Sequence, residues 1–370
     1  MRSRLLKNII SLTGALILNL YSINVSAQNA VEQAELEKSQ QLSRRTTSTM
    51  DNPFELVEDW PTLLPGQEWG AAIGLLPDDT GGLWMLFRSE PPINYINADG
   101  QITKSFGEGM IVQAHGFCMD NDGNLWAGDS GPFRDDPSTA GRGFQMHKFS
   151  QEGEHLLSLG KAGVSIGGED TFIGPTACAV TPDGNIVIAD GHWPRPSNAQ
   201  QDGDRLVVVT PEGDFIKSVG KLGAGPGEFM GPHALAYDAN DRLFVADRSN
   251  NRVQILDKEL NFLDDWRHFG RPSGITILEN GTMVVADSES GGELAGPSVA
   301  PEGGPGSTAR NPGFQVGIRV GRVNGSLQFF VPGTRPEGMA ADNLGNIFAG
   351  LTSGCDLSPS GGCLQKWVRK

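Results

Sequence analysis

A short segment recurs six times along the chain, and this repetition constrains the fold more than any other feature. The clearest copy, His233–Asp247, reads as an apolar strand, a tight turn and a second apolar strand. The other copies are Ala72–Phe87, His115–Asp129, Thr176–Asp190, Ser273–Asp287 and Glu337–Leu351. Self-similarity of this kind is the signature of a repeat architecture. We therefore expect a chain built from similar β units.

The turns inside the copies favour tight hairpins. Asn121-Asp-Gly-Asn124 and Pro182-Asp-Gly-Asn185 contain Asp-Gly pairs, whose glycine adopts the positive φ that such turns need. A third and a fourth strand follow, for example Arg252–Asp257 and Asn261–Trp266. Six units of four antiparallel strands predict an all-β, six-bladed β-propeller, because radial stacking protects the sheet edges.

The two ends of the chain predict how the ring closes. The last unit lacks a fourth strand after Leu364–Val368, whereas Glu55–Pro61 near the N-terminus resembles one. We expect this N-terminal strand to complete the last blade and close the ring, so that the propeller spans residues 54–370. Residues 28–53, rich in Gln, Ser, Glu and Thr, are expected to form a flexible lead.

Residues 1–27 read as a secretory signal peptide. Three cations come first: Arg2, Arg4 and Lys7. An apolar run from Ile9 to Leu20 follows, too short for a good membrane span, and Val25-Ser-Ala27 forms an Ala-type cleavage site. We expect an exported product, periplasmic or extracellular, with no membrane attachment after the signal is removed.

The charge of the chain bears on its partners. The formal net charge is −15, and it becomes −18 when the three cations of the signal peptide are removed. Such a surface repels phosphate backbones, which argues against nucleic acid as a partner. We expect a monomer that takes a small-molecule or peptide substrate.

Four cysteines in an exported protein permit disulfides. Cys355 and Cys363 flank the short segment Asp-Leu-Ser-Pro-Ser-Gly-Gly, so a bridge that closes a loop is expected between them. Cys118 and Cys178 lie in apolar, strand-like runs without a CxxC partner. For this second pair we expect buried free thiols.

Candidate functional residues fall at equivalent ends of the repeats. In an up-and-down sheet, the start of one strand and the end of the next lie on the same rim. His115 and His233 start first strands, and Arg88, His192 and Arg248 follow second strands, so all five should share one rim. Glu337 joins them by repeat position. First strands line the channel of a propeller, so these side chains are expected to converge near its axis.

Three long insertions between second and third strands belong to the same rim: Ser130–Gly143, Gly191–Asp204 and Ser288–Pro312. Loops of this length in a compact domain are commonly functional. We expect them to wall a substrate cleft over the mouth of the channel.

His115, His233 and Glu337 form a candidate metal site. Two imidazoles and a carboxylate suit zinc with an open fourth position, and the carboxylate also suits other divalent ions. The alternative is that a histidine before Gly or Ala merely fits a tight strand start. Thr176 and Ser273 occupy equivalent positions, so the repeat itself does not require histidine.

Arg88 and His192 are candidate catalytic residues. Arg88 follows Phe87, which stands where other copies tend to carry an aspartate. Its guanidinium suits the anchoring of a carboxylate, and the alternative is a salt bridge on the rim. The imidazole of His192 suits a general acid or base, and the alternative is a solvated loop histidine.

These motifs resemble a known family. The repeat resembles the NHL repeat, and the arrangement from Trp60 to the last strand is similar to peptidyl-α-hydroxyglycine α-amidating lyase, the lyase half of the peptide-amidating enzyme. The most specific stretches are His115-Gly116, Asp122-Gly-Asn-Leu-Trp126, Pro226-Gly-Glu-Phe229, Pro232-His233 and Ala246-Asp-Arg248.

The resemblance implies a zinc enzyme that cleaves a C-terminal α-hydroxyglycine into a peptide amide and glyoxylate. By position, His115 and His233 match two of the three histidine ligands of the family, and Arg88 matches its arginine at the reacting centre. The third ligand position holds Glu337 here, and the position of the tyrosine holds His192. The acidic residue that holds a structural calcium in the family is Gly338 here, so calcium is not carried over.

Three functions are open on the sequence. The first is an exported metal-dependent enzyme of amidating-lyase type, whose substrate need not be a hydroxyglycine peptide. The second is a non-catalytic NHL-repeat propeller that binds a peptide, a protein or a glycan on the same rim. The third is a lactonase-like hydrolase on the same fold, whose usual first-blade glutamate ligand has no counterpart here. Metal bound to the purified protein would separate the first from the second.

Overall fold

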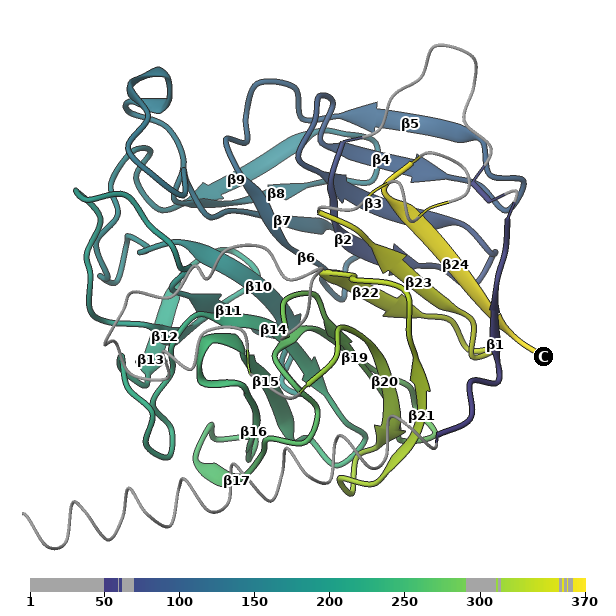
Figure 1. Cartoon of the computed structure of the whole chain (residues 1–370). Helices are drawn as coiled ribbons and strands as arrows, with labels where there is room; N and C mark the ends of the chain where they lie inside the picture. The colour runs from purple at the N-terminus through teal and green to yellow at the C-terminus, as the bar shows by residue number, and fades with distance from the viewer. Residues whose placement is uncertain are drawn as a thin grey trace, which may run out of the picture.

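The computed structural model describes residues 50–58, 60–61, 70–290, 311, 314–352, 355, 358 and 362–370. The predicted signal peptide, the lead as far as residue 49 and most of the Ser288–Pro312 insertion lie outside these residues. Six sheets radiate from a central axis (Figure 1). Among the described residues, no helix has the length and apolar character that a membrane crossing needs.

Each sheet is an antiparallel unit of four strands, as the repeat predicts. The first three sheets are β2 (Ala72–Pro77), β3 (Leu83–Phe87), β4 (Ile93–Ile96) and β5 (Ile102–Phe106); β6 (Ala114–Met119), β7 (Leu125–Asp129), β8 (Gln145–Phe149) and β9 (His155–Leu159); and β10 (Pro175–Val180), β11 (Ile186–Asp190), β12 (Arg205–Val209) and β13 (Phe215–Val219). The next two are β14 (Pro232–Tyr237), β15 (Leu243–Asp247), β16 (Arg252–Leu256) and β17 (Phe262–Trp266); and β18 (Pro272–Ile277), β19 (Thr282–Asp287), β20 (Gly317–Arg322) and β21 (Leu327–Val331). Two single-turn 3₁₀ helices, η1 (Pro137–Thr139) and η2 (Arg248–Asn250), follow second strands.

The sixth sheet combines residues from both ends of the described chain. It contains β22 (Gly338–Ala341), β23 (Ile347–Gly350), β24 (Leu364–Arg369) and, beyond β24, β1 (Phe54–Leu56). Phe54 pairs with Arg369, and the Lys370 N–H donates to Pro53 O over 2.8 Å. The N-terminal segment therefore supplies the fourth strand of this sheet, over a shorter stretch than the Glu55–Pro61 expected from sequence.

Buried aspartates at the ends of the second strands position the starts of the first strands. Asp129 ends β7 and accepts the N–H groups of Val112 and Gln113, three and two residues before His115, over 2.8 and 2.9 Å. Asp190 accepts from Ile173 and Gly174 in the same way. Because each carboxylate ties the end of one strand to the chain that enters its neighbour, the repeat fixes the rim on which the histidines lie.

One cysteine expectation is wrong and the other is confirmed. Cys118 of β6 and Cys178 of β10 form a disulfide between the second and third sheets, so they are not free thiols. A single strand's pattern cannot reveal this pairing, because the two cysteines meet only when neighbouring blades pack together. The expected bridge between Cys355 and Cys363 is present.

Candidate functional site

Three histidines from three sheets meet at one end of the central channel. His115 lies in β6, His233 lies in β14, and His192 follows β11 by two residues. One ring nitrogen of each lies within 4.8 Å of the others, and all three side chains are buried. The sequence placed all three on this rim, but it assigned His192 to proton transfer and not to the cluster.

The three imidazoles share one tautomer. Nδ1 of His115 lies 2.7 Å from Thr176 O, Nδ1 of His233 lies 2.6 Å from Ser273 O, and Nδ1 of His192 lies 3.2 Å from Pro194 O. A backbone carbonyl only accepts hydrogen bonds, so each Nδ1 carries the hydrogen and each Nε2 keeps its lone pair.

The free lone pairs lie inside the cluster. Nε2 of His115 and Nε2 of His233 are buried, and within the described chain the only polar atom set against either is Oε1 of Glu337, 3.1 Å from Nε2 of His233. A histidine that donates through one nitrogen to a carbonyl while the other nitrogen stays free is the arrangement of a metal ligand.

The surroundings favour neutral imidazoles. Burial lowers the pKa of His115 and that of His192 well below 6.5. Nearby His233 and Arg88 act in the same direction on both pKa values, and Arg248 also lowers that of His192. Burial and Arg248 also lower the pKa of His233, although Glu337 opposes them. Neutral imidazole is the form that binds a metal ion.

Glu337, immediately before β22, borders this cluster. Its Oε1 lies 3.1 Å from Nε2 of His233 and 3.0 Å from Nη1 of Arg248, and Thr352 donates to Oε2. Burial alone would raise the pKa of Glu337, but Arg88, His233 and Arg248 together hold it well below 4.5.

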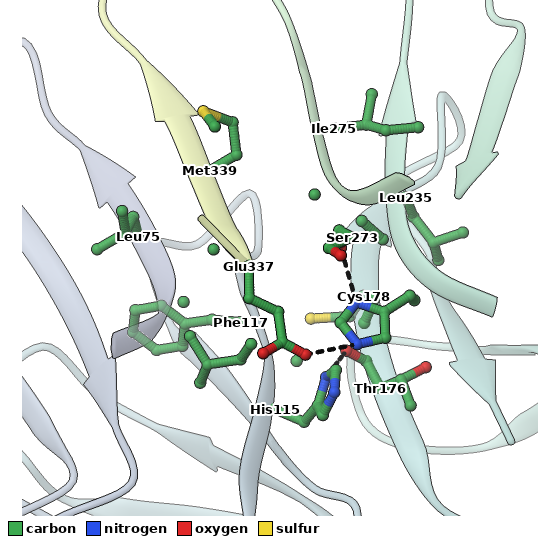
Figure 2. A pocket seen from close by; sticks show the side chains of 18 residues that line it. Leu75, His115, Phe117, Thr176, Cys178, Leu235, Ser273, Ile275, Glu337 and Met339 are labelled. Carbon is green, nitrogen blue, oxygen red and sulfur yellow. Dashed lines mark hydrogen bonds and ion pairs between the residues drawn. The ribbon is translucent and has the colours of Figure 1, made fainter. Parts of the chain in front are cut away.

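The contact between Glu337 and His233 is favourable only if a proton or a metal ion lies near it. Nε2 of His233 and the ionised carboxylate are both acceptors when Nδ1 carries the hydrogen. Two acceptor atoms 3.1 Å apart repel each other unless a proton or a metal ion lies near them. Figure 2 shows His115 and Glu337 directed into the same space at this end of the channel.

Two arginines lie beside the cluster, Arg248 buried and Arg88 partly exposed. Arg88 follows β3, donates through Nε to Ala114 O over 3.1 Å and lies 5.2 Å over the ring of Phe133. Arg248 begins η2 and donates through Nη2 to Trp193 O over 3.2 Å. Nη2 of Arg88 and Nε of Arg248 have no hydrogen-bond partner within the described chain. The sequence placed Arg248 on this rim but gave it no role.

A cleft of about 620 Å³ opens over the cluster, as the insertions predicted. Phe133 comes from the 130–143 insertion and Trp193 from the 191–204 insertion. The ring of Phe133 stacks on His192 with centroids 4.4 Å apart. Asp135 joins the two insertions, because its carboxylate accepts from both the N–H and the hydroxyl of Ser197.

The channel beneath the cluster offers far less space, about 80 Å³. Apolar side chains line it (Figure 2): Leu75, Phe117, Leu235, Ile275 and Met339. A substrate larger than a few waters can therefore reach the histidines only from the cleft.

The donor set fits a transition metal and not the structural calcium of the amidating lyases. Three imidazoles with free lone pairs match zinc, whereas calcium takes oxygen ligands. Gly338 stands where that family has an acidic residue, and a Cβ there would lie 2.5 Å from Ile73 O. No carboxylate can occupy this position without moving the backbone.

Comparisons with known proteins agree with the fold. The NHL repeat family model matches residues 229–256. A probable peptidyl-α-hydroxyglycine α-amidating lyase of Caenorhabditis elegans is 29% identical over 175 residues, which are 46% of this chain and 44% of the relative. The matched segment thus spans less than half the length of that lyase. The NHL repeat-containing protein 3 of mouse is 26% identical over 259 residues, 64% of this chain and 67% of the relative.

Solved structures resemble the chain in fold alone. A gluconolactonase from Xanthomonas campestris superposes with a TM-score of 0.54 at 14% identity, over 82% of this chain and 87% of the other. The chain is accordingly a divergent six-bladed NHL-repeat β-propeller.

Proposed function

We propose that this protein is an exported, metal-dependent enzyme of amidating-lyase type that acts on an anionic substrate in the cleft. The observation that carries the proposal is the cluster of three buried histidines, each with Nδ1 against a backbone carbonyl and with one ring nitrogen of each within 4.8 Å of the others. Two disulfides among four cysteines suit the oxidising compartment that export implies.

The histidines would hold the metal through Nε2. Three imidazoles leave a fourth position open, as in catalytic zinc sites. Bound zinc supplies Lewis-acid chemistry, withdrawing electron density from a substrate hydroxyl or carbonyl oxygen.

Arg88 and Arg248 bind the carboxylate of the substrate in this proposal. Both residues line the cleft beside Glu337, and each guanidinium has a buried nitrogen without a hydrogen-bond partner in the described chain. An anion that enters gains charge-assisted hydrogen bonds with groups that are already desolvated. The positive charge is local, because the chain as a whole carries −15.

Glu337 accepts the proton. The sequence suggested Glu337 as a metal ligand and His192 as the proton-transfer group. In this proposal His192 is a metal ligand and Glu337 is the proton acceptor. The ionised Glu337 borders the cleft and takes the proton of the substrate hydroxyl. The C–O bond then becomes a carbonyl as the C–N bond breaks, and the departing nitrogen takes a proton, giving an amide and glyoxylate.

Metal analysis of the purified protein tests the proposal first. We expect about one zinc per chain in the wild type and less than a tenth of that in His233→Ala or His192→Ala. His155→Ala, which alters an exposed histidine of β9, serves as the control and should retain the metal. If the wild type holds no metal, or if both site variants keep it, the non-catalytic binding propeller becomes the better interpretation.

Product analysis tests the reaction. An α-hydroxyglycine peptide should release glyoxylate in proportion to bound metal. Opening of gluconolactone without glyoxylate release would favour the lactonase-like hydrolase, whose fold the chain shares with the Xanthomonas enzyme.

A further inference from the structure

His115 is held by the neighbouring blade more than by its own. The pairing of β6 with β7 shifts between Ala114 and Phe117, so His115 has no partner in that ladder. Its fixed contact is the hydrogen bond from Nδ1 to Thr176 O of β10. Thr176 itself lies at the shift between Pro175 and Ala177 in the pairing of β10 with β11.

Regular pairing resumes at Phe117 and Ala177, and the two cysteines are the next residues in the ladders. Cys118 pairs with Trp126 and Cys178 pairs with Ile188. Their disulfide therefore joins β6 to β10 at regularly paired positions just beyond the two irregular segments. Both cysteines are nearly inaccessible to solvent, at 7% and 5% exposure, within an apolar cluster between the blades.

The two strands approach closely between the disulfide and His115. A Cβ on Gly116 would lie 2.9 Å from the backbone of Ala177. Thr176 continues the connection to the next blade, because its hydroxyl donates to Pro232 O, next to His233. A change in the spacing of β6 and β10 thus reaches both histidines.

We propose that Cys118 and Cys178 are positioning residues of the metal centre. Their disulfide holds β6 against β10, so that the carbonyl of Thr176 keeps Nε2 of His115 directed at the other two histidines. The inference rests on the proposed metal-binding function for its consequence, although the orientation of His115 can be measured without metal.

The first test measures zinc affinity on folded protein, by competition with a chromophoric chelator. Cys118→Ala/Cys178→Val removes the bridge and keeps the apolar volume. We expect zinc to bind roughly tenfold to hundredfold more weakly, the usual effect of losing a group that orients a ligand. Cys355→Ala/Cys363→Val is the matched control and should change affinity by less than about twofold. Equal affinities in the two variants would overturn the inference.

The second test reads the tautomer of His115 by ¹⁵N NMR in metal-free protein. The wild type and the control should keep the hydrogen on Nδ1, and the variant without the Cys118–Cys178 bridge should show exchange between tautomers. A wild type that binds no zinc defeats the proposed function, while an unchanged tautomer in the variant defeats the inference.

Should that variant fail to fold, both measurements are made on the control variant before and after reduction. Its only disulfide is then Cys118–Cys178. Unchanged affinity and an unchanged tautomer after reduction count equally against the inference.

Discussion

Among single residues, Glu337 offers the clearest separation of metal binding from chemistry. Glu337→Gln keeps the shape of the side chain and removes its charge. If three histidines hold the metal, zinc content should stay near the wild-type value while glyoxylate release falls by at least about 100-fold, the usual contribution of a general base. Zinc content and product are measured on the same preparation.

The matched control is Glu152→Gln, whose carboxylate is 83% exposed and pairs with Lys104. It should leave both readouts unchanged. A Glu337→Gln protein that loses zinc as well would make Glu337 a ligand, as the sequence suggested, and not the proton acceptor.

His147 couples stability to pH. Burial lowers its pKa to about 4, and the neighbouring His155 adds to this. The unfolded chain takes up a proton near pH 6.5, where the folded chain does not. Above about pH 6.5, His147 is neutral in both states and the folded protein has its full stability. As the pH falls toward 4, the free energy of unfolding decreases by about 3 kcal/mol, because only the unfolded chain takes up the proton. His147→Gln removes this dependence.

Thermal unfolding followed by circular dichroism between about pH 7.5 and pH 4.5 checks this prediction. The wild-type midpoint should fall more steeply with acid than that of His147→Gln. Parallel curves for the two proteins would show that His147 does not carry the effect.

Among the elements, the two described insertions over the cleft are joined at their exposed ends by Asp135 and Ser197. Asp135 accepts from Ser197 across the cleft wall, at exposed positions. Asp135→Ala should loosen the wall, raise KM about threefold to tenfold and leave kcat near the wild-type value, because the reacting groups are untouched. Stability should change by less than about 1 kcal/mol.

Steady-state kinetics and chemical denaturation give these values. Asp202→Ala alters an exposed residue of the insertion that carries Ser197 and should change neither. A fall in kcat with KM unchanged in Asp135→Ala would instead place the loop contact in the chemical step.

The strands could be predicted from the sequence because the turn residues that specify them lie within a few positions of each strand. Asp122-Gly123 and Asp183-Gly184 form turns in which the glycines adopt φ of 82° and 84°, and the hairpins follow at their expected places. The rim carrying His115 and His233 follows from the same repeat. Local signals of this kind survive in a single sequence because turn geometry depends on few residues.

Other features depend on contacts that no local pattern encodes. His192 joins the cluster through the path of an insertion, which the repeat does not specify. The Cys118–Cys178 bridge depends on how two blades pack. The spare N–H of Arg248 becomes visible only when Glu337 and Trp193 are placed around it.

In the whole molecule, the sixth sheet depends on a three-residue strand. Phe54 of β1 is 6% exposed and packs edge-on against Phe329, in a cluster that includes Trp367. Phe54→Ala should lower the free energy of unfolding by about 3 kcal/mol, the low end for a buried phenylalanine because the strand is short.

Urea denaturation measures the loss. Glu55→Ala alters the exposed neighbour in the same strand and should cost under about 0.5 kcal/mol. Similar midpoints for the two variants would mean that β1 contributes little to holding the sheet.

Because the sixth sheet contains strands from both ends of the described chain, it also affects the order in which the sheets fold. β1 lies early in the chain, but it has no partner strand until β24, which ends at Arg369, is available for pairing. The strands around His115, His192 and His233 belong to sheets made entirely from earlier residues, whose more local contacts form faster. The histidine cluster can therefore assemble before Glu337 arrives, and the carboxylate is the last group to join the centre during folding.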